Sequence, residues 1–311
     1  MDTLTHLALG LAVASLSGHP FSLHDPVYLA ALLGAEAPDL DIVSHLRGPW
    51  AYLKTHRLLS HSLPGLLVWS LLIGLVLYLY GHAFTASFMW AACGCFSHII
   101  FDYFNTHGAS VAWPWQKQRL SEPLLKVFDP ILLCLIILPF LLAPASVNQG
   151  IESLCFAAAY VLLQYQLRYV VKSKLQQHYK NQAARHIYIM PSLNHGLCWD
   201  YIVQSEQKIH LGNYTTLSGI LTENKVLPMS EENALLALGT GTRLDQFFQF
   251  FTPYPYYFVT KTEASFCITI SDLRYTSPTG FIHWGFMHFN QNKQLETTYL
   301  FTYKQKILIA P

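Results

Sequence analysis

The sequence predicts an α-helical integral-membrane domain of about six helical segments, followed by a mostly antiparallel, soluble β domain. Of the 311 residues, 52% are hydrophobic and only 12% are charged, whereas about 25% of an average soluble chain is charged. Long apolar runs dominate before position 172, and apolar and polar residues alternate after position 185. We therefore expect a helical membrane domain over residues 1–171, a basic linker over residues 172–185 and a β domain over residues 186–311.

The expected membrane helices fall into two classes by length. The longer apolar segments are Leu63–Tyr80, Phe84–Tyr103, Asp129–Ala145 and Ile151–Val171. They are comparable to the roughly 20 residues that a helix needs to cross a bilayer. Leu4–Leu16 and Pro26–Ala37 are shorter, at about 12 residues each. Each of these two could be a short span, a re-entrant segment or a buried core helix.

The connections between the apolar segments differ in charge. Lysine and arginine are present in residues 39–62, in residues 104–128 and after the last apolar segment, whereas residues 17–25, 81–83 and 144–150 contain neither. Cytoplasmic loops of membrane proteins carry an excess of these two residues. The pattern therefore predicts a multi-pass protein with both termini on the cytoplasmic side.

The chain from position 186 has the pattern of β strands. β-branched and aromatic residues alternate with polar ones, and Pro, Gly and Asn separate the runs, which is typical of antiparallel sheets. The expected strands are His186–Met190, Trp199–Gln204, Tyr256–Lys261, Ser265–Ile270, Gly280–Phe289 and Thr297–Gln305. Ser230–Gly239 has an acidic first turn and a final glycine, which predicts a short helix.

Residues with metal-ligand chemistry gather at the ends of the apolar segments. They are His6, Asp39, Asp41, His56, His61, His98 and Asp102. Such groups are expensive to place in or beside lipid and usually serve a function. Imidazole and carboxylate groups are common metal ligands, and the charge-derived topology puts all seven at the cytoplasmic face. We therefore predict that they converge on divalent metal.

Two of these pairs have a spacing that favours convergence. His98 and Asp102 are four residues apart, so both project from one face of a helix; the alternative is a buried hydrogen-bonded pair. Asp39 and Asp41 follow Pro38, and alternation in an extended stretch puts both carboxylates on one side. The alternative for the two aspartates is that they end a helix.

The remaining histidines are interpreted by their local context. His56 and His61 would diverge in a continuous helix, but Pro64 disfavours helix immediately before it. A loop could therefore bring the two imidazoles together. His6 lies alone on an apolar helix and could equally be a core residue.

Two further residues are assigned supporting roles. Arg57 could bind an anion such as phosphate, and we assign it the catalytic role of stabilising developing negative charge. Its alternative is an anchor on the cytoplasmic side. Asp129 precedes a predicted span and could hold a ligating histidine in place, or could cap the helix.

The number of candidate ligands suggests more than one ion. Seven exceed the four that one tetrahedral zinc ion requires, so the set would suit two or three ions. Zinc is the first choice because mixed imidazole and carboxylate ligands suit it, with manganese or iron as alternatives. Close multi-metal sites stabilise the attacking and leaving oxygens in phosphoester hydrolysis.

The order of the motifs resembles a known family. MDTLTH, PDLD, HRLLSHS, HIIFDYFNTHG and the later Phe128-Asp129-Pro130 are similar to blocks of the bacterial YdjM-type inner-membrane proteins, often labelled LexA-binding. The resemblance covers about residues 1–170 and implies a metal-dependent hydrolase in the bacterial inner membrane. The β-rich tail resembles an extension found in part of that family. The His/Asp set is also remotely similar to zinc phospholipase C and P1-type nucleases.

Together these patterns predict a membrane-bound metal-dependent hydrolase that acts on a phosphoester of a lipid or lipid-linked substrate. The expected partners are the lipid bilayer and that substrate, while a net charge of +1 gives no sign of a nucleic-acid surface. One alternative is a non-enzymatic protein that transports or senses a divalent metal. Another is a β domain that recruits a cytoplasmic partner, with the helices as its anchor.

Overall fold

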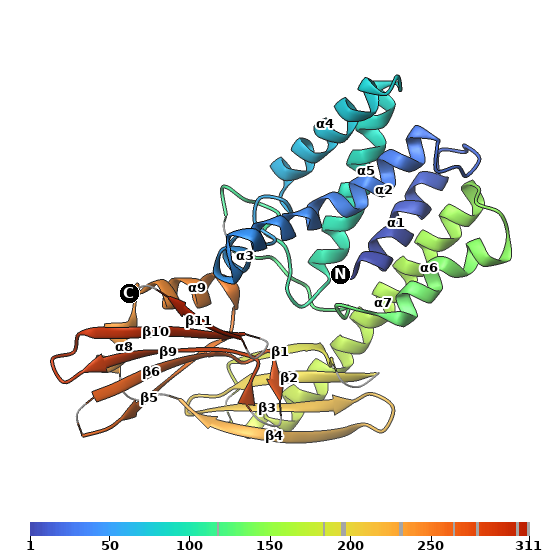
Figure 1. Cartoon of the computed structure of the whole chain (residues 1–311). Helices are drawn as coiled ribbons and strands as arrows, with labels where there is room; N and C mark the ends of the chain where they lie inside the picture. Colours follow the sequence, from blue (N-terminus) through green and yellow to red (C-terminus); the bar gives the residue numbers. More distant parts are fainter. Residues whose placement is uncertain are drawn as a thin grey trace. The chain divides into compact units, whose positions relative to one another are not determined.

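The chain divides into two compact units in the computed structural model (Figure 1). The structure describes residues 1–116, 118–182, 184–193, 197–229, 233–263, 265–277, 280–302 and 305–309. The first unit comprises Met1–Val170 and a short segment that starts at Met190. The second comprises Val171–Ile189 and the chain from Leu197 on. A helical N-terminal region followed by antiparallel β sheets confirms the predicted fold class at this level.

Helices make up the first unit. Their bounds are Thr3–Ser15 (α1), Pro26–Glu36 (α2), Ala37–Arg47 (the 3₁₀ helix η1), Pro49–Thr55 (α3), Leu63–Leu79 (α4), Phe84–Tyr103 (α5), Pro130–Leu142 (α6) and Val147–His178 (α7). Helix α5 packs against α1, α2 and α4. The side chains of Asp2, Asp25, Ser62 and Asp129 accept backbone hydrogen bonds at the starts of α1, α2, α4 and α6. These N-caps explain why the helices begin where they do.

Glycines let α2 and α5 approach closely. A Cβ atom on Gly34 would lie 2.2 Å from the carbonyl oxygen of Ala91, and one on Gly94 would lie 2.1 Å from that of Ala31. Any larger residue at either position would force the two backbones apart. The close approach matters for the candidate site because it brings the end of α2 against the middle of α5.

Among the described residues, two helices are long and apolar enough to cross a membrane by length and composition, α5 and α7. Helices α1, α4 and α6 are apolar but shorter. Helix α4 exposes a row of apolar side chains, including Leu67, Leu71 and Leu75, as expected for a face that contacts lipid. The crossing of the bilayer by all six predicted segments, and their orientation, stay predictions.

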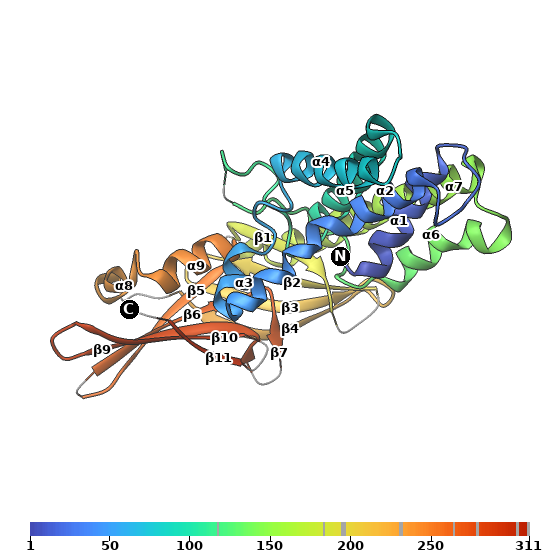
Figure 2. The ribbon, with the colours of Figure 1, turned by 45° about the horizontal axis from the view of Figure 1, so that its top comes forward.

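Antiparallel strands form most of the second unit. One sheet contains His186–Pro191 (β1), Cys198–Gln204 (β2), Lys208–Thr215 (β3) and Ile220–Pro228 (β4) in that order. The other has the order β11-β10-β9-β6-β5, with bounds Gln305–Ile309, Leu295–Thr302, His283–Asn290, Ser265–Asp272 and Pro255–Lys261. Thr276–Ser277 (β7) and Gly280–Phe281 (β8) form a small ribbon. Helices α8 (Asn233–Gly239) and α9 (Arg243–Phe251) pack on the five-stranded sheet (Figure 2).

The structure corrects several details of the predicted β domain. Strands β3, β4, β7 and β11 and helix α9 were not predicted. The expected strand Gly280–Phe289 is divided between β8 and β9. Strand β4 lies at a sheet edge and is almost wholly exposed, so its sequence lacks the alternation that marks a half-buried strand. The predicted helix Ser230–Gly239 corresponds to α8, and its first three residues lie outside the described residues.

Candidate metal centre

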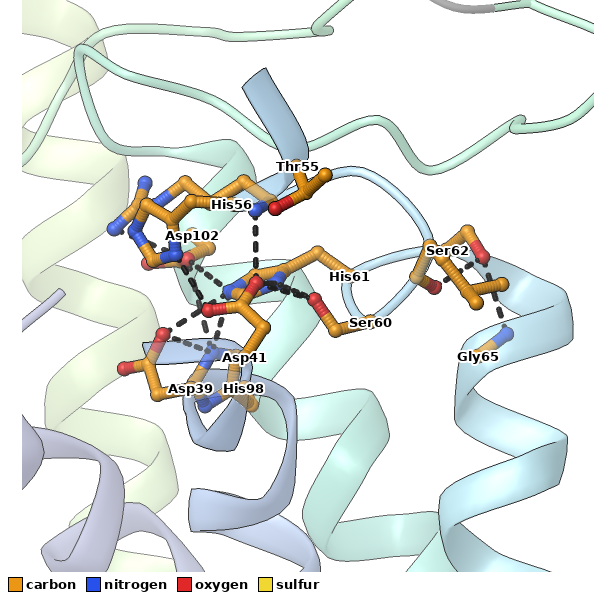
Figure 3. A network of polar contacts seen from close by, with 12 residues as sticks. Asp39, Asp41, Thr55, His56, Ser60, His61, Ser62, Gly65, His98 and Asp102 are labelled. Atoms are coloured by element: carbon orange, nitrogen blue, oxygen red, sulfur yellow. Dashed lines mark hydrogen bonds and ion pairs between the residues drawn. The ribbon is translucent and has the colours of Figure 1, made fainter. Parts of the chain in front are cut away.

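Four ligand-type side chains converge inside the helical unit. Asp39, His61, His98 and Asp102 each offer one ligand atom, and these atoms all lie within 4.8 Å of one another. His61, His98 and Asp102 are fully buried, whereas the side chain of Asp39 is 24% exposed. Figure 3 shows that they come from three separate elements and point toward one centre. A metal ion could bind this group.

Local structure explains how three elements supply the group. His98 and Asp102 lie one turn apart on α5, and His98 Nε2 is 3.7 Å from Asp102 Oδ2. Asp39 follows Pro38 in η1, directly after α2. His61 lies in the turn between α3 and α4, and the next residue, Ser62, caps α4.

Hydrogen bonds fix which nitrogen of each imidazole faces the centre. The Nδ1 of His98 is 2.6 Å from the carbonyl oxygen of Ala35, which can only accept, so Nδ1 carries the proton. The Ser60 hydroxyl donates to Asp41 Oδ2 at 2.6 Å, so its oxygen accepts from His61 Nδ1 at 2.9 Å. In the neutral rings, both Nε2 atoms therefore carry lone pairs, and they face each other at 3.2 Å.

The charges around these two nitrogens require a cation or a proton. His61 Nε2 is 3.2 Å from Asp39 Oδ1 and 3.3 Å from Asp102 Oδ2. Burial disfavours protonated His61, but hydrogen bonds with Asp102 and Asp39 outweigh it and raise the pKa of His61. Burial likewise opposes ionisation of Asp39, yet its hydrogen bond with His61 holds the pKa of that carboxyl well below its usual range. Two lone pairs and two carboxylates aimed at one point are the arrangement that a divalent cation would neutralise.

Asp41 and His56 lie beside the group of four and hydrogen-bond to each other. Asp41 Oδ1 is 2.6 Å from His56 Nδ1, and Asp41 Oδ2 accepts from the Ser60 hydroxyl and from the backbone N–H of Arg57. Burial lowers the pKa of His56. Burial would raise the pKa of Asp41, but the hydrogen bond with His56 outweighs it and lowers that pKa. The structure thus shows Asp41 supporting His61 through Ser60, a contact that sequence reasoning missed.

Arg57 is buried and points to the same centre. Its Nη1 donates to the carbonyl oxygen of Gly108 at 3.2 Å, and its Nη2 lies 3.3 Å from Asp102 Oδ2. Its backbone has a φ of 63°, a left-handed conformation that is costly for a residue with a side chain. The strained turn places His56 and His61 on the same side, as Figure 3 shows, although they are five residues apart.

His6 lies at the edge of the group. Its ring is fully buried and stacks on that of His98 with centroids 3.6 Å apart. Its Nε2 is 3.6 Å from Asp102 Oδ1, and within the described part of the chain neither ring nitrogen has a hydrogen-bond partner. The amino group of Met1 also forms an ion pair with Asp102. A buried imidazole with both nitrogens unsatisfied is costly, so His6 is placed as a ligand would be.

Two acidic residues, Asp129 and Glu36, differ in how their contacts relate to the candidate site. Asp129 caps α6 and accepts from the Tyr160 hydroxyl at 3.1 Å, and among the described residues none of its hydrogen bonds reaches a histidine. The structure therefore favours its N-cap alternative. Glu36 was not predicted, yet its Oε1 is buried and has no hydrogen-bond partner in the described residues. The sequence signal that could have identified Glu36 is its position three residues before Asp39, at the end of an apolar segment.

Removal of the Ser60 hydroxyl should weaken metal binding without touching a ligand. In Ser60→Ala, His61 Nδ1 and Asp41 each lose a hydrogen bond, so the ring is free to turn. Loss of such a supporting contact typically costs about 10- to 100-fold in metal affinity. Competition with a chromophoric zinc chelator measures the change. The matched control is Ser62→Ala, which removes the α4 cap and a hydrogen bond to the Leu59 carbonyl but none of the hydrogen bonds of Asp41 or His61. Equal affinities for Ser60→Ala and Ser62→Ala would contradict this role.

A buried His/Asp centre in an apolar helical domain defines the class as a membrane protein with a candidate metal site. Residues 1–171 match the family model described as YdjM inner membrane protein, so the chain belongs to that family, as its motifs predicted. It is also similar to the "Uncharacterized protein YfhP" of Bacillus subtilis (strain 168), with 25% identity over 313 residues that cover 96% of this chain and 94% of the relative. No solved structure matches the chain.

Proposed function

We propose that this protein is a membrane-bound, metal-dependent hydrolase that cleaves a phosphoester of a lipid or lipid-linked substrate at the cytoplasmic face. The observation that carries the proposal is the pair of Nε2 atoms of His61 and His98, 3.2 Å apart between two carboxylates. Membership of an inner-membrane family supports the membrane location. Helix α5 is long and apolar enough to cross a bilayer, so a site at its end would lie near headgroup depth.

Asp39, His61, His98 and Asp102 would hold the ion, with zinc as the first choice and manganese or iron as alternatives. A bound zinc ion lowers the pKa of water at the site toward 7 and polarises a phosphoryl oxygen. Four protein ligands would fill a tetrahedral zinc shell, so hydrolysis would require a fifth, open position, to which zinc can expand. We assign the open side to Asp39, because it alone of the four is partly exposed.

The remaining residues have roles that follow from their contacts. Asp41 and Ser60 orient His61, and the Ala35 carbonyl orients His98. Arg57 neutralises Asp102 and keeps further N–H donors for a phosphate oxygen. His56, which is 21% exposed, lies on the accessible side with Asp39, and we assign His56 and Asp41 to positioning, although the sequence predicted them as ligands.

A second ion would be held by His6 and by Asp102 Oδ1, and it would take the place of the Met1 amino group, which pairs with this oxygen. Asp102 Oδ2 faces His61 and His98, while its Oδ1 faces His6. A carboxylate placed in this way can bridge two ions, and two neighbouring ions stabilise both oxygens of an in-line displacement at phosphorus. This arrangement supports a phosphoester as substrate.

The alternative is a non-enzymatic protein that transports or senses a divalent metal. In favour of a hydrolase, the ligands gather at one place and leave the rest of α5 apolar, whereas a transport path needs polar groups through the bilayer. A cavity for substrate beside the cluster stays a prediction.

The function is tested on the full-length protein in detergent with a panel of phosphodiesters that includes phospholipids. We expect hydrolysis that is lost after chelation and restored by zinc, manganese or iron. His24→Gln, which changes an exposed histidine away from the cluster, should keep full activity. If zinc binds but no phosphodiester is cleaved, and zinc crosses vesicles that contain the protein, the transport alternative replaces the hydrolase.

A further inference from the structure

Helix α7 is longer than a bilayer requires. Its 32 residues give a length of about 48 Å at 1.5 Å per residue, whereas the hydrocarbon core is about 30 Å thick. Arg168, in the C-terminal half of α7, forms an ion pair with Glu122. The helix then continues through Lys172 and Gln176, one turn apart on one face. With the apolar part of α7 in the bilayer, which its length and composition allow, its last turns would lie at headgroup depth, outside the hydrocarbon.

A cavity of about 420 Å³ opens beside these turns. It is lined by Lys172, Gln176, Tyr179, Lys180, Ala184, Arg185, His186 and Ile187. Tyr179 is fully buried and forms part of the floor, because its hydroxyl is hydrogen-bonded to Tyr201 and Glu223. A fixed aromatic floor gives the cavity a defined shape.

Positive charge surrounds the cavity. Lys172, Lys180 and Arg185 contribute three cations, and no acidic residue is among its lining residues. Arg185 pairs with Glu206, but this pair is well exposed and therefore weak. Within the described ranges, neither lysine has an ion-pair partner.

Two general effects could explain the lysines without any binding site. Lysines after a membrane helix anchor it on the cytoplasmic side, and they interact favourably with the helix dipole. Here, however, Arg185 and His186 come from the chain that returns after Lys180–Gln182, not from α7 itself. Cations from two elements thus face one hollow, which neither general effect requires. An anion-binding site accounts for this convergence.

We propose that this cavity binds the phosphate group of an anionic phospholipid headgroup. Phosphate is the shared chemistry of a headgroup and of free phosphate in solution, and the position beside a membrane helix favours the headgroup. Bound lipid would fix the end of α7 to the membrane surface. The inference is independent of the proposed metal chemistry, because none of its residues belongs to the metal centre.

The test uses the full-length protein in nanodiscs of phosphatidylcholine, with and without phosphatidylglycerol. Native mass spectrometry after transfer to detergent counts the lipids that stay bound. General attraction to an anionic surface contributes about fivefold in affinity for each lysine. Direct contact with phosphate adds to it, so Lys172→Gln with Lys180→Gln should lower phosphatidylglycerol retention by more than about 25-fold. Phosphatidylcholine retention should not change.

The matched control removes the same charge from elsewhere. Lys174 lies on the same helix, about 200° around its axis from Lys172, and Lys208 is an exposed residue of β3. Lys174→Gln with Lys208→Gln should lower retention clearly less than the cavity pair. Equal losses in the two variants would overturn the proposal, because they would reflect general membrane electrostatics.

A competition arm separates the two sources of phosphate. Inorganic phosphate is added in place of chloride at equal ionic strength. Continued retention of phosphatidylglycerol supports the headgroup as ligand. Displacement of the lipid by inorganic phosphate, with phosphate then bound in discs of phosphatidylcholine alone, would overturn the headgroup assignment in favour of a soluble ligand.

Discussion

His98→Ala should abolish stoichiometric metal binding in the full-length protein. The substitution removes Nε2, one of two imidazole nitrogens at the centre, and leaves Asp39 and Asp102 with a single histidine between them. Because loss of only a supporting contact costs about 10- to 100-fold, loss of a ligand should cost more than about a thousandfold. Elemental analysis of purified protein, compared with His24→Gln, measures the loss.

Thermal unfolding provides a second readout for the same variant. A ligand present at about 1,000 times its dissociation constant stabilises a protein by about 4 kcal/mol. Zinc should therefore raise the melting temperature of the wild-type protein and of His24→Gln, but not that of His98→Ala. A His98→Ala protein that folds and is still stabilised by zinc would show that the centre lies elsewhere.

Metal affinity should fall steeply as the solution is acidified. A proton and the metal compete for Nε2 of His61, and the hydrogen bonds with Asp102 and Asp39 raise the pKa of His61 against the effect of burial. Above this raised pKa the affinity is constant. Below it, the apparent affinity falls by about tenfold for each pH unit, so the loss begins above the ordinary histidine value of about 6.5.

The variant Asp39→Asn tests whether the proton that competes with the metal is the one on His61. Asp39→Asn removes one group that favours protonated His61, so the onset of the loss should move to lower pH even though the affinity at high pH is also reduced. Asp39 itself does not set the window, because its pKa lies well below its usual range. Zinc titrations between pH 5.5 and pH 8 measure the profile at about half-unit steps. An affinity that stays constant over this range would refute proton competition at His61.

Much of the fold could be predicted from local sequence. The apolar segments Leu63–Tyr80 and Phe84–Tyr103 correspond closely to α4 and α5, because long, nearly uninterrupted apolar runs have few alternatives. Helix α9 was missed because its aromatic residues suggest strand propensity. Its buried positions Leu244, Phe247, Phe248 and Phe251 nevertheless follow helical spacing.

The sequence by itself determined the family, the apolar helical domain followed by β structure, and the residue types of the candidate centre. The motifs at His98 and Asp102, and at Asp39, indicated metal ligands because polar groups at the ends of apolar helices are costly without a function. The family match confirmed the resemblance.

Only the tertiary structure decided which of these residues meet. Sequence spacing specifies a shared face within one helix, but His61 reaches His98 through a strained turn at Arg57, and Ala35 reaches His98 through the glycine contacts of α2 with α5. Nothing local marks Ser60 as the link between Asp41 and His61. These contacts join positions far apart in the chain, so their geometry follows from packing between elements, which no local pattern encodes.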